Sequence, residues 1–455
     1  MITLARKSLT KVGIDQTIAF TVISKIIQAV GGVATLAFVA RFLTKAEQGY
    51  YYTFGSILAI QIFFELGLCN IIIQFVAHEN ATITWRDDAT FEGSVESISR
   101  LSSLLRFTVK WFVVISILFI IGLLITGYVF FKKFGNVNDF VEWQGPWFLL
   151  AVTTALALFA APVMAYLEGL GKMKEVAKVR VVQQIIQLPL MLILFSFGFK
   201  LYSAPIAYTI ALSVIPIWIF CSRQKQILKN IWNKIDSFRV DYKKEIFPFQ
   251  WKIALSWISG FFIFQLFNPV LFATEGAVVA GQMGMTITVL NSILMLTLSW
   301  VSTKTPTFSV LIARKEYKQL DKLFNIALIQ STILNVFGLC VFFFLVFVLR
   351  YFQISINGKP FGDRFLDYKS MLFMAIPITL NHIIAGWATY LRCHKKEPML
   401  VQSIIIAIMC SASTFVFGHA YGVNGITTGY LAISFISFSW TYFIYKNNKR
   451  NWHCE

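Results

Sequence analysis

The sequence Gln16-TIAFTVISKIIQAVGGVATLAFV-Ala40 is followed, after a short turn, by Gly49-YYYTFGSILAIQIFFELGLCNIIIQFV-Ala77. Each apolar run exceeds the roughly 20 residues that an α-helix needs to cross about 30 Å of hydrocarbon. Lys25 lies in the middle of the first run and Glu65 in the middle of the second. A charge at mid-membrane costs at least roughly 2.5–3.5 kcal/mol, so it usually faces a partner or a watery cavity. The two runs therefore predict paired spanning helices with a functional polar interior.

The composition of the whole chain extends this prediction. Of 455 residues, 57% are hydrophobic and 14% charged, and the mean hydropathy is +0.68. A soluble domain usually contains about 25% charged residues. The sequence therefore predicts a multi-pass membrane protein with little room for a separate soluble domain. The first apolar run is too long for a signal-peptide core and has no persuasive cleavage site, so we expect it to be retained.

Hydropathy predicts an all-α fold of twelve spans, with boundaries good to a few residues. The predicted spans are 16–40, 49–77, 108–131, 147–168, 181–199, 204–222, 251–272, 277–302, 324–349, 370–390, 399–418 and 425–445. Dense basic runs at Lys172–Arg180, Arg223–Lys244 and Arg314–Lys322 predict, by the positive-inside rule, that both termini are cytoplasmic. Topology and anionic lipid headgroups then explain most of the net charge of +18, and nucleic acid is not expected as a partner.

The chain also shows signs of an internal repeat. Tyr166-Leu-Glu-Gly-Leu-Gly-Lys ends the fourth predicted span and Tyr390-Leu-Arg-Cys-His-Lys ends the tenth. Two further weak matches share an offset of about half the chain. We therefore expect two six-helix lobes, residues 1–235 and 236–455, related by an axis along the membrane normal. Within the first lobe, the spacing of Ile98, Leu101, Leu104 and Leu105 predicts an amphipathic helix on the inner surface, in a loop at about 78–106.

Several short motifs resemble a known family. They are Ala40-Arg-Phe-Leu43, Glu47-Gln-Gly49-Tyr50, Glu65-Leu-Gly67-Leu68, Leu167-Glu-Gly169-Leu-Gly171-Lys172 and Pro306-Thr-Phe-Ser309 followed by Ala313-Arg-Lys-Glu-Tyr-Lys-Gln-Leu320. With the twelve-span topology, they resemble the polysaccharide transporter, or Wzx-type O-antigen flippase, family of the multidrug/oligosaccharidyl-lipid/polysaccharide (MOP) exporter superfamily. The resemblance implies a MATE/MOP-like fold, with two lobes around a cavity that opens alternately to each side. It also implies movement of undecaprenyl-pyrophosphate-linked sugar units across the bacterial inner membrane.

A lipid-linked oligosaccharide has a polar, anionic head that cannot cross hydrocarbon unaided. Its flippase needs a wet, cationic cavity, and the sequence offers Lys25, Arg41 and Arg180 as pyrophosphate ligands. Each has an alternative role. Lys25 could form a structural pair with Glu65, Arg41 could anchor its helix at the interface, and Arg180 could serve helix packing. Guanidinium groups suit bidentate phosphate binding.

Uncharged polar side chains inside the predicted spans are candidates for lining the cavity. They are Gln28, Gln61, Gln184, Asn268, Asn381 and His382, to which the carboxylate Glu65 is added. The alternative for each is a hydrogen bond between packed helices. His382 could also titrate near neutral pH, since histidine has an unperturbed pKa of about 6.5.

Two other functions compete with the flippase. A cation-coupled multidrug exporter of the same superfamily would favour embedded acids, and Glu65 is the clear mid-span carboxylate. A membrane polysaccharide polymerase or ligase would favour a large outer loop with catalytic residues, and none is evident. We expect a non-enzyme without a cofactor, driven by an H⁺ or Na⁺ gradient or by substrate flux because no ATP motif is present. The expected partners are the lipid-linked substrate, membrane lipids and the polysaccharide polymerase machinery.

Overall fold

The computed structural model describes residues 31–32, 34–86, 91–135, 141–234, 236, 238–356, 359–394, 396 and 398–454. These residues are mostly helical, and ten helices among them are long and apolar enough to cross a membrane. The chain is therefore a multi-pass membrane protein. The predicted first span, with Lys25 and Gln28, lies largely outside the described residues.

The described chain forms two compact units. Of the described residues, unit 1 includes those up to Thr35 together with those in 60–132 and 142–257, and unit 2 includes those in 36–59, 133–141 and from Ile258 onward. The segment Leu36–Ala59 thus groups with the C-terminal half, although it precedes most of unit 1 in the sequence. The two lobes that the sequence predicts, 1–235 and 236–455, stay a prediction.

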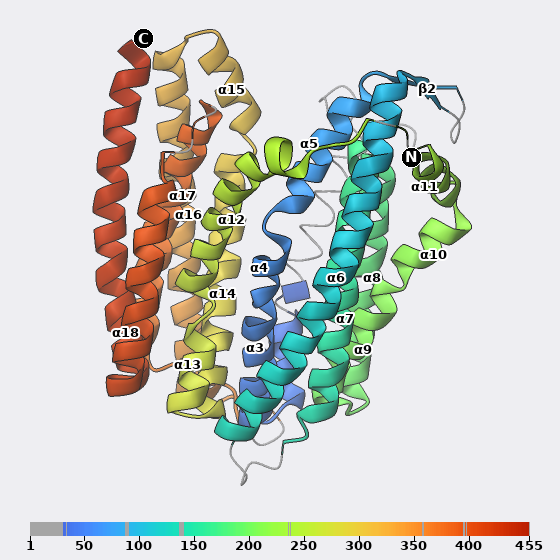
Figure 1. Ribbon diagram of the computed structural model, residues 1–455. Coiled ribbons are helices and arrows are strands. Elements are labelled where there is room, and N and C mark those ends of the chain that lie inside the picture. The colour runs from blue at the N-terminus through green and yellow to red at the C-terminus, as the bar shows by residue number, and fades with distance from the viewer. Residues whose placement is uncertain are drawn as a thin grey trace, which may run out of the picture. The chain divides into compact units, whose positions relative to one another are not determined.

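Unit 1 is a helical bundle (Figure 1) in which α7, α8 and α9 pack against one another and α5 packs on α7. Its elements are α4 (Ile62–Glu65), α5 (Leu68–Asn80), the hairpin β1 (Ile83–Trp85) and β2 (Phe91–Gly93), α6 (Val95–Phe134), α7 (Gln144–Gly169), α8 (Met173–Ser196), η3 (Lys200–Tyr202), α9 (Ser203–Leu212), α10 (Val214–Cys221), α11 (Gln224–Asn233) and η4 (Tyr242–Ile246). The helix α12 (Phe247–Phe264) begins in unit 1 and continues into unit 2.

The inner-surface helix expected near residues 98–105 is not a separate element, and this part of the prediction is wrong. These residues form the first turns of α6, a continuous helix of 40 residues. Leu101, Leu104 and Leu105 are buried. The Leu101 carbonyl accepts a hydrogen bond from the Tyr166 hydroxyl at 3.0 Å. The apolar stripe is real, but it packs against protein rather than against lipid.

An ion-pair cluster joins three segments at the same end of unit 1. The Arg100 guanidinium donates to Glu79 at 2.7 Å and to Glu245 at 2.5 Å. The hydrogen bond from Arg100 holds the pKa of the Glu245 carboxyl below its usual value. The cluster therefore ties the end of α5 and η4 to the start of α6.

Unit 2 contains α3 (Lys45–Leu58) from the N-terminal part of the chain and the helices that follow α12. These are α13 (Phe267–Thr274), α14 (Ala277–Ser302), α15 (Thr305–Ala313), α16 (Tyr317–Tyr351), α17 (Tyr368–Cys393) and α18 (Leu400–Cys454), with η5 (Gly362–Arg364) and the hairpin β3 (Ser355–Ile356) and β4 (Lys359–Pro360) between α16 and α17. The element η1 (Ala59–Gln61) leads from α3 back to unit 1.

The element α18 covers both predicted spans 399–418 and 425–445. Gly422 interrupts it with non-helical angles, φ 54° and ψ −135°. A Cβ atom on Gly429 would lie 2.1 Å from Ser413 Oγ, and Gln402 donates to Thr441 at 2.5 Å. The two parts of α18 therefore pack against each other as an antiparallel helical hairpin. The total of twelve spans stays a prediction, because the first is largely outside the described residues.

Candidate functional site

The helix of the second predicted span is interrupted before and after the segment that contains Glu65. The chain forms a 3₁₀ turn at Ala59–Gln61, and α4 then ends at Glu65. Leu66 and Gly67 follow with left-handed φ values of 50° and 68°. A Cβ on Gly67 would lie 2.4 Å from Ile253 Cγ2, so only glycine fits the close approach. Broken helices at membrane depth are tolerated where they are buried in protein or line a water-filled cavity.

Glu65 lies in a cluster of polar side chains within unit 1. The Cys69 side chain is next to the Glu65 carboxylate, with Glu168 and Arg180 within electrostatic reach. Arg180 Nη2 forms an ion pair with Glu168 Oε1 at 2.6 Å. Arg180 remains 54% exposed at its side chain, so it can reach other anions. The structure thus pairs Arg180 with Glu168 and places Glu65 beside Cys69, and a common site for Arg180 and Glu65 stays a prediction.

The polar residues predicted in the second half of the chain make hydrogen bonds between helices. Asn268 donates to Ser56 Oγ at 3.0 Å, which joins α13 to α3. Asn381 donates to the Tyr430 hydroxyl at 2.8 Å, which joins α17 to α18. His382 is buried, with Nδ1 at 3.4 Å from Thr332 Oγ1 on α16. These contacts agree with the alternative role in helix packing, and Asn381 also lines a cavity.

That cavity has a volume of about 160 Å³ and lies among α12, α17 and α18 of unit 2. We name it the amide cavity. Its polar lining includes Asn381, Arg392, Gln402, Tyr430 and Ser434, and Phe264 and several isoleucines complete it. Apolar and aromatic side chains with a few polar groups among them are typical of small-molecule sites.

The remaining predicted site residues have less defined surroundings. Arg41 is exposed, with its guanidinium 5.3 Å from the centroid of the Phe42 ring. Gln61 and Gln184 are half-buried in unit 1. Lys25 and Gln28 lie outside the described residues. A pair between Lys25 and Glu65 therefore stays a prediction.

The sequence did not reveal the most deeply buried cation among the described residues. Arg364, on η5, is 1% exposed. Its guanidinium donates to the Leu43 carbonyl at 2.6 Å and to Gln48 Oε1 at 3.0 Å. Burial lowers the pKa of Arg364, and the nearby carboxylate of Glu47 opposes that shift. The one signal in the sequence is an arginine between apolar residues, Phe361 and Phe365, in an expected loop.

Close to Arg364, α3 packs tightly against α14. Gln48 donates to the Gly281 carbonyl at 2.9 Å. A Cβ on Gly49 would lie 1.8 Å from the Ala277 carbonyl oxygen, and one on Gly281 would lie 2.8 Å from the Gly49 nitrogen. Small residues that let two backbones touch are typical of helix contacts in membranes. We call this contact, together with the Arg364 hydrogen bonds, the α3 seam.

Solved structures with the same fold are transporters of the MOP superfamily. A multidrug resistance MATE family transporter in its inward-facing conformation matches with a TM-score of 0.58 at 15% identity, covering 93% of this chain and 99% of that one. The lipid II flippase MurJ matches with a TM-score of 0.58 at 14% identity, covering 94% and 87%. A MOP superfamily transporter from Pyrococcus furiosus gives 0.55 at 14% identity, covering 95% and 96%.

These likenesses define the fold as that of MOP superfamily transporters. The proteins that share this fold include multidrug transporters and a lipid flippase. No family model and no curated protein matches the sequence.

Proposed function

We propose that this protein is a flippase for undecaprenyl-pyrophosphate-linked oligosaccharides, the repeat units of O-antigen, capsule or exopolysaccharide. It would move them across the bacterial inner membrane by alternating access through a cationic cavity. The fold supports transport, since both a lipid flippase and drug exporters share it. The sequence motifs around Glu65 and Leu167 favour the polysaccharide branch.

The distribution of charge in the spans is the observation that separates the two transporter functions. Among the carboxylates of the described residues, Glu65 is the one in the middle of a predicted span, at the break between α4 and α5. Glu79, Glu168 and Asp321 lie near helix ends. A cation-coupled drug exporter needs embedded acids for cations and protons, whereas a flippase for an anionic head needs embedded bases. The scarcity of acids supports the flippase.

In this proposal Lys25, Arg41 and Arg180 bind the pyrophosphate at different stages. Arg180 can exchange its partner Glu168 for the substrate, because an ion pair with an exposed arginine is worth little, about 0–1 kcal/mol. The sequence predicts Lys25 as the cation at mid-membrane depth. Replacing it by alanine should abolish export while folded protein remains at the wild-type level, and Lys25→Arg should retain part of the activity. Normal export by a well-expressed Lys25→Ala variant would show that transport does not require Lys25.

The decisive experiment measures lipid-linked saccharides in cells that lack the protein. Accumulation of undecaprenyl-pyrophosphate oligosaccharide in the inner leaflet, with loss of surface polysaccharide, is the expected result. Unchanged lipid intermediates with increased sensitivity to cationic drugs would instead identify a drug exporter. Complete lipid-linked units on the outer face, left unpolymerised, would identify a polymerase or ligase.

A further inference from the structure

The segment that connects α10 to α12 in unit 1 carries a concentrated positive charge. Residues 223–245 contain seven basic and three acidic side chains, a net charge of +4. The basic side chains are all exposed, and they belong to Arg223, Lys225, Lys229, Lys234, Arg239, Lys243 and Lys244. Because α10 and α12 both belong to candidate membrane spans, the segment between them lies close to a membrane surface.

The helix α11, which begins this segment, has an apolar face and a basic face. Ile227 and Ile231 are each 1% exposed. Lys225 and Lys229 lie on the opposite face and are exposed. Residues four apart in an α-helix are neighbours on its surface, so the two lysines are adjacent. Protein covers the isoleucines, and α11 therefore presents its lysines outward instead of inserting its apolar face into lipid.

The irregular chain after α11 is held in place by serines in the first turns of α6. Ser99 Oγ accepts a hydrogen bond from the Asp236 amide at 2.8 Å and donates to the Phe238 carbonyl at 2.7 Å. Ser103 Oγ accepts from the Val240 amide at 3.0 Å. These bonds use backbone groups of the segment. They fix the path of the chain without engaging its basic side chains.

The same helix also holds the end of α11. The Trp232 carbonyl accepts hydrogen bonds from Arg106 Nη2 at 2.6 Å and from Ser102 Oγ at 3.1 Å. The Arg106 guanidinium lies 5.4 Å from the centroid of the Trp232 ring. The segment is therefore a fixed surface on α6. We name its four exposed side chains Lys225, Lys229, Arg239 and Lys243 the basic platform.

Two carboxylates close to the basic platform are directed to other partners. Asp241 Oδ1 caps η4 by accepting from the Lys243 amide at 3.0 Å and the Lys244 amide at 3.3 Å. Its second oxygen lies 4.0 Å from Lys244 Nζ, so Lys244 is left out of the platform. Glu245 forms its ion pair with Arg100 of α6. The segment thus keeps its positive charge on the outside.

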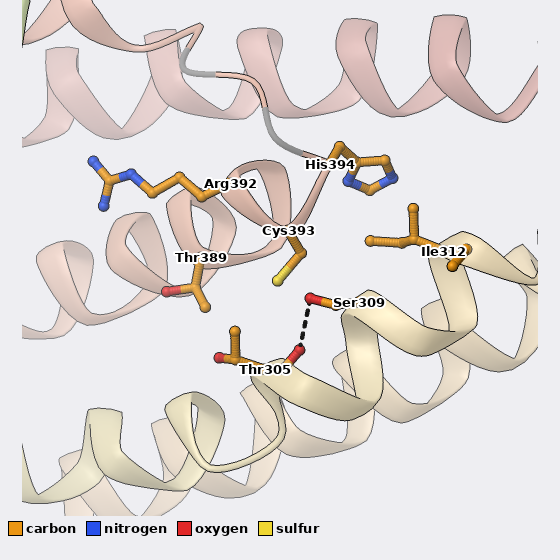
Figure 2. Close-up of a pocket in the computed structure, with 8 residues that line it drawn as sticks. Thr305, Ser309, Ile312, Thr389, Arg392, Cys393 and His394 are labelled. Carbon is orange, nitrogen blue, oxygen red and sulfur yellow. Dashed lines mark hydrogen bonds between the residues drawn. The ribbon is translucent and has the colours of Figure 1, made fainter. Parts of the chain in front are cut away.

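The larger cavity of unit 2 differs from this surface. It has a volume of about 530 Å³ and lies between α15 and the end of α17. Figure 2 shows the Arg392 guanidinium directed away from the other lining side chains, among them Ser309, Cys393 and His394. Arg392 therefore does not supply a cation to that cavity, whereas the basic platform presents several cations together.

We propose that the basic platform binds the headgroups of anionic phospholipids in the leaflet that it faces. Polybasic segments next to membrane spans are attracted to anionic lipid surfaces. The helix α11 lies at the edge of unit 1 (Figure 1), where lipid can approach it from the side. Phe238 and Trp251 are 46% and 42% exposed beside the platform, and aromatic side chains are typical of the membrane–water interface. This inference holds whichever molecule the protein transports.

The test measures lipid binding to the full-length protein at α11 itself. A neutral fluorophore is attached through Asn233→Cys, at the exposed end of α11, in a background without the six native cysteines. The protein is placed in phosphatidylcholine nanodiscs that contain increasing fractions of phosphatidylglycerol with a nitroxide on one chain. Nitroxide-labelled phosphatidylcholine is the reference. We expect the anionic lipid to quench the fluorophore at much lower fractions than the reference lipid.

The variant that tests the platform combines Lys225→Gln with Lys229→Gln. It should weaken the quenching by phosphatidylglycerol roughly tenfold, because each lysine near an anionic surface adds to the attraction. The matched control combines Lys174→Gln with Lys178→Gln. These two lysines are also exposed, four residues apart on a helix of unit 1, and outside the platform. The control removes the same charge and should leave the quenching unchanged.

Ser99→Ala tests whether α6 positions the platform. It keeps every charge but removes the hydrogen bonds to the Asp236 amide and the Phe238 carbonyl. We expect it to weaken the binding of phosphatidylglycerol by a smaller factor than the double lysine variant. Binding equal to wild type would contradict a platform that is held in place by α6.

Three other results would overturn the inference. Equal quenching by the two labelled lipids would show that the platform does not select an anionic headgroup. Wild-type quenching in the variant of Lys225 and Lys229 would show that these lysines do not bind the lipid. An equal loss in the variant of Lys174 and Lys178 would reduce the effect to the general charge of this end of the protein. Size exclusion and thermal unfolding of each variant identify any loss that comes from misfolding.

Discussion

At the scale of single residues, Arg364 shows how a buried charge can hold two distant parts of a chain together. Its hydrogen bonds reach Leu43 and Gln48, more than 300 residues away in the sequence. Arg364→Met keeps an unbranched, apolar stem but removes the guanidinium, so the Leu43 carbonyl and the Gln48 side-chain oxygen lose their donor. Unsatisfied buried groups cost roughly 1–3 kcal/mol each.

We therefore expect Arg364→Met to lower the thermal unfolding midpoint of the detergent-solubilised protein clearly. Arg364→Lys should recover only part of the loss, because an ammonium cannot reproduce the planar fork that donates to two acceptors. Arg350→Met is a useful comparison, since Arg350 donates to carbonyls of the same loop but is only half-buried. An Arg364→Met protein as stable as wild type would show that the seam does not depend on this side chain.

The sequence shows which polar residues lie inside predicted spans, but it does not show which residues they form hydrogen bonds with. The structure pairs Arg180 with Glu168 and Asn381 with Tyr430, and the substrate-binding roles of Glu65, Arg180 and Asn381 stay predictions. Arg364 was missed, because its surroundings are created by segments far away in the sequence. Hydropathy carries no information about such contacts.

At the scale of elements, the α3 seam depends on glycine where two backbones touch. A methyl group at Gly49 would overlap the Ala277 carbonyl, whereas nothing lies within 4 Å of a Cβ placed on Gly55 of the same helix. Gly49→Ala should therefore separate α3 from α14 and lower the unfolding midpoint. Gly55→Ala should leave it unchanged or raise it, since alanine favours a helix over glycine by about 1 kcal/mol. Equal effects of the two substitutions would mean that close backbone contact is unimportant.

The cluster of Arg100 with Glu79 and Glu245 should make the stability of the fold depend on pH. The pKa of Glu245 is lowered in the folded protein, so its pairing stabilises the fold above the ordinary pKa of 4.5 and loses that effect as the pH falls below it. Glu245→Gln should reduce stability by about 1 kcal/mol at pH 7, and the difference from wild type should shrink in acid. Glu92→Gln, from the exposed pair with Arg86, should have almost no effect at either pH. A difference that stays constant with pH would contradict this.

The positions of the spans were largely predictable, because a long apolar run in a membrane has few stable structures other than a helix. Their interruptions were not predictable in the same way. The break at Leu66 and Gly67 lies inside a continuous apolar run, and Ile253, which packs against it, comes from α12. Similarly, the stripe of Leu101 and Leu104 correctly indicated an amphipathic helix, but the sequence could not tell that protein covers its apolar face.

At the scale of the whole molecule, segments predicted on one side of the membrane contact each other. Lys45 pairs with Asp363 at 3.4 Å, and both belong to loops expected outside. Lys449 pairs with Asp321 at 2.9 Å, and both were expected inside. The Tyr166 hydroxyl donates to the Leu101 carbonyl and the Tyr390 hydroxyl to the Asp321 carboxylate, and the internal repeat stays a prediction. The assignment of Leu36–Ala59 to unit 2 was not predictable, since nothing in its composition distinguishes it from the residues that follow.

The proposed alternating-access mechanism would give that segment a role in the transport cycle. The chain leaves unit 2 at Ala59 and enters unit 1 at Ile60, within the 3₁₀ turn of η1. We expect the α3 seam to open when the cavity opens to the outside. Cysteines at Lys45 and Asp363, in a background without the six native cysteines, would allow a short reducible cross-linker to hold the seam closed.

Cross-linking should stop flipping of a fluorescent lipid-linked saccharide in proteoliposomes, and reduction should restore it. The matched control is the Lys45→Cys variant alone, treated with the same reagent, which should keep its activity. If the fully cross-linked protein still flipped its substrate, the seam would be a permanent part of unit 2. Movement would then have to occur elsewhere in the second span, with the left-handed Leu66 and Gly67 as the remaining break.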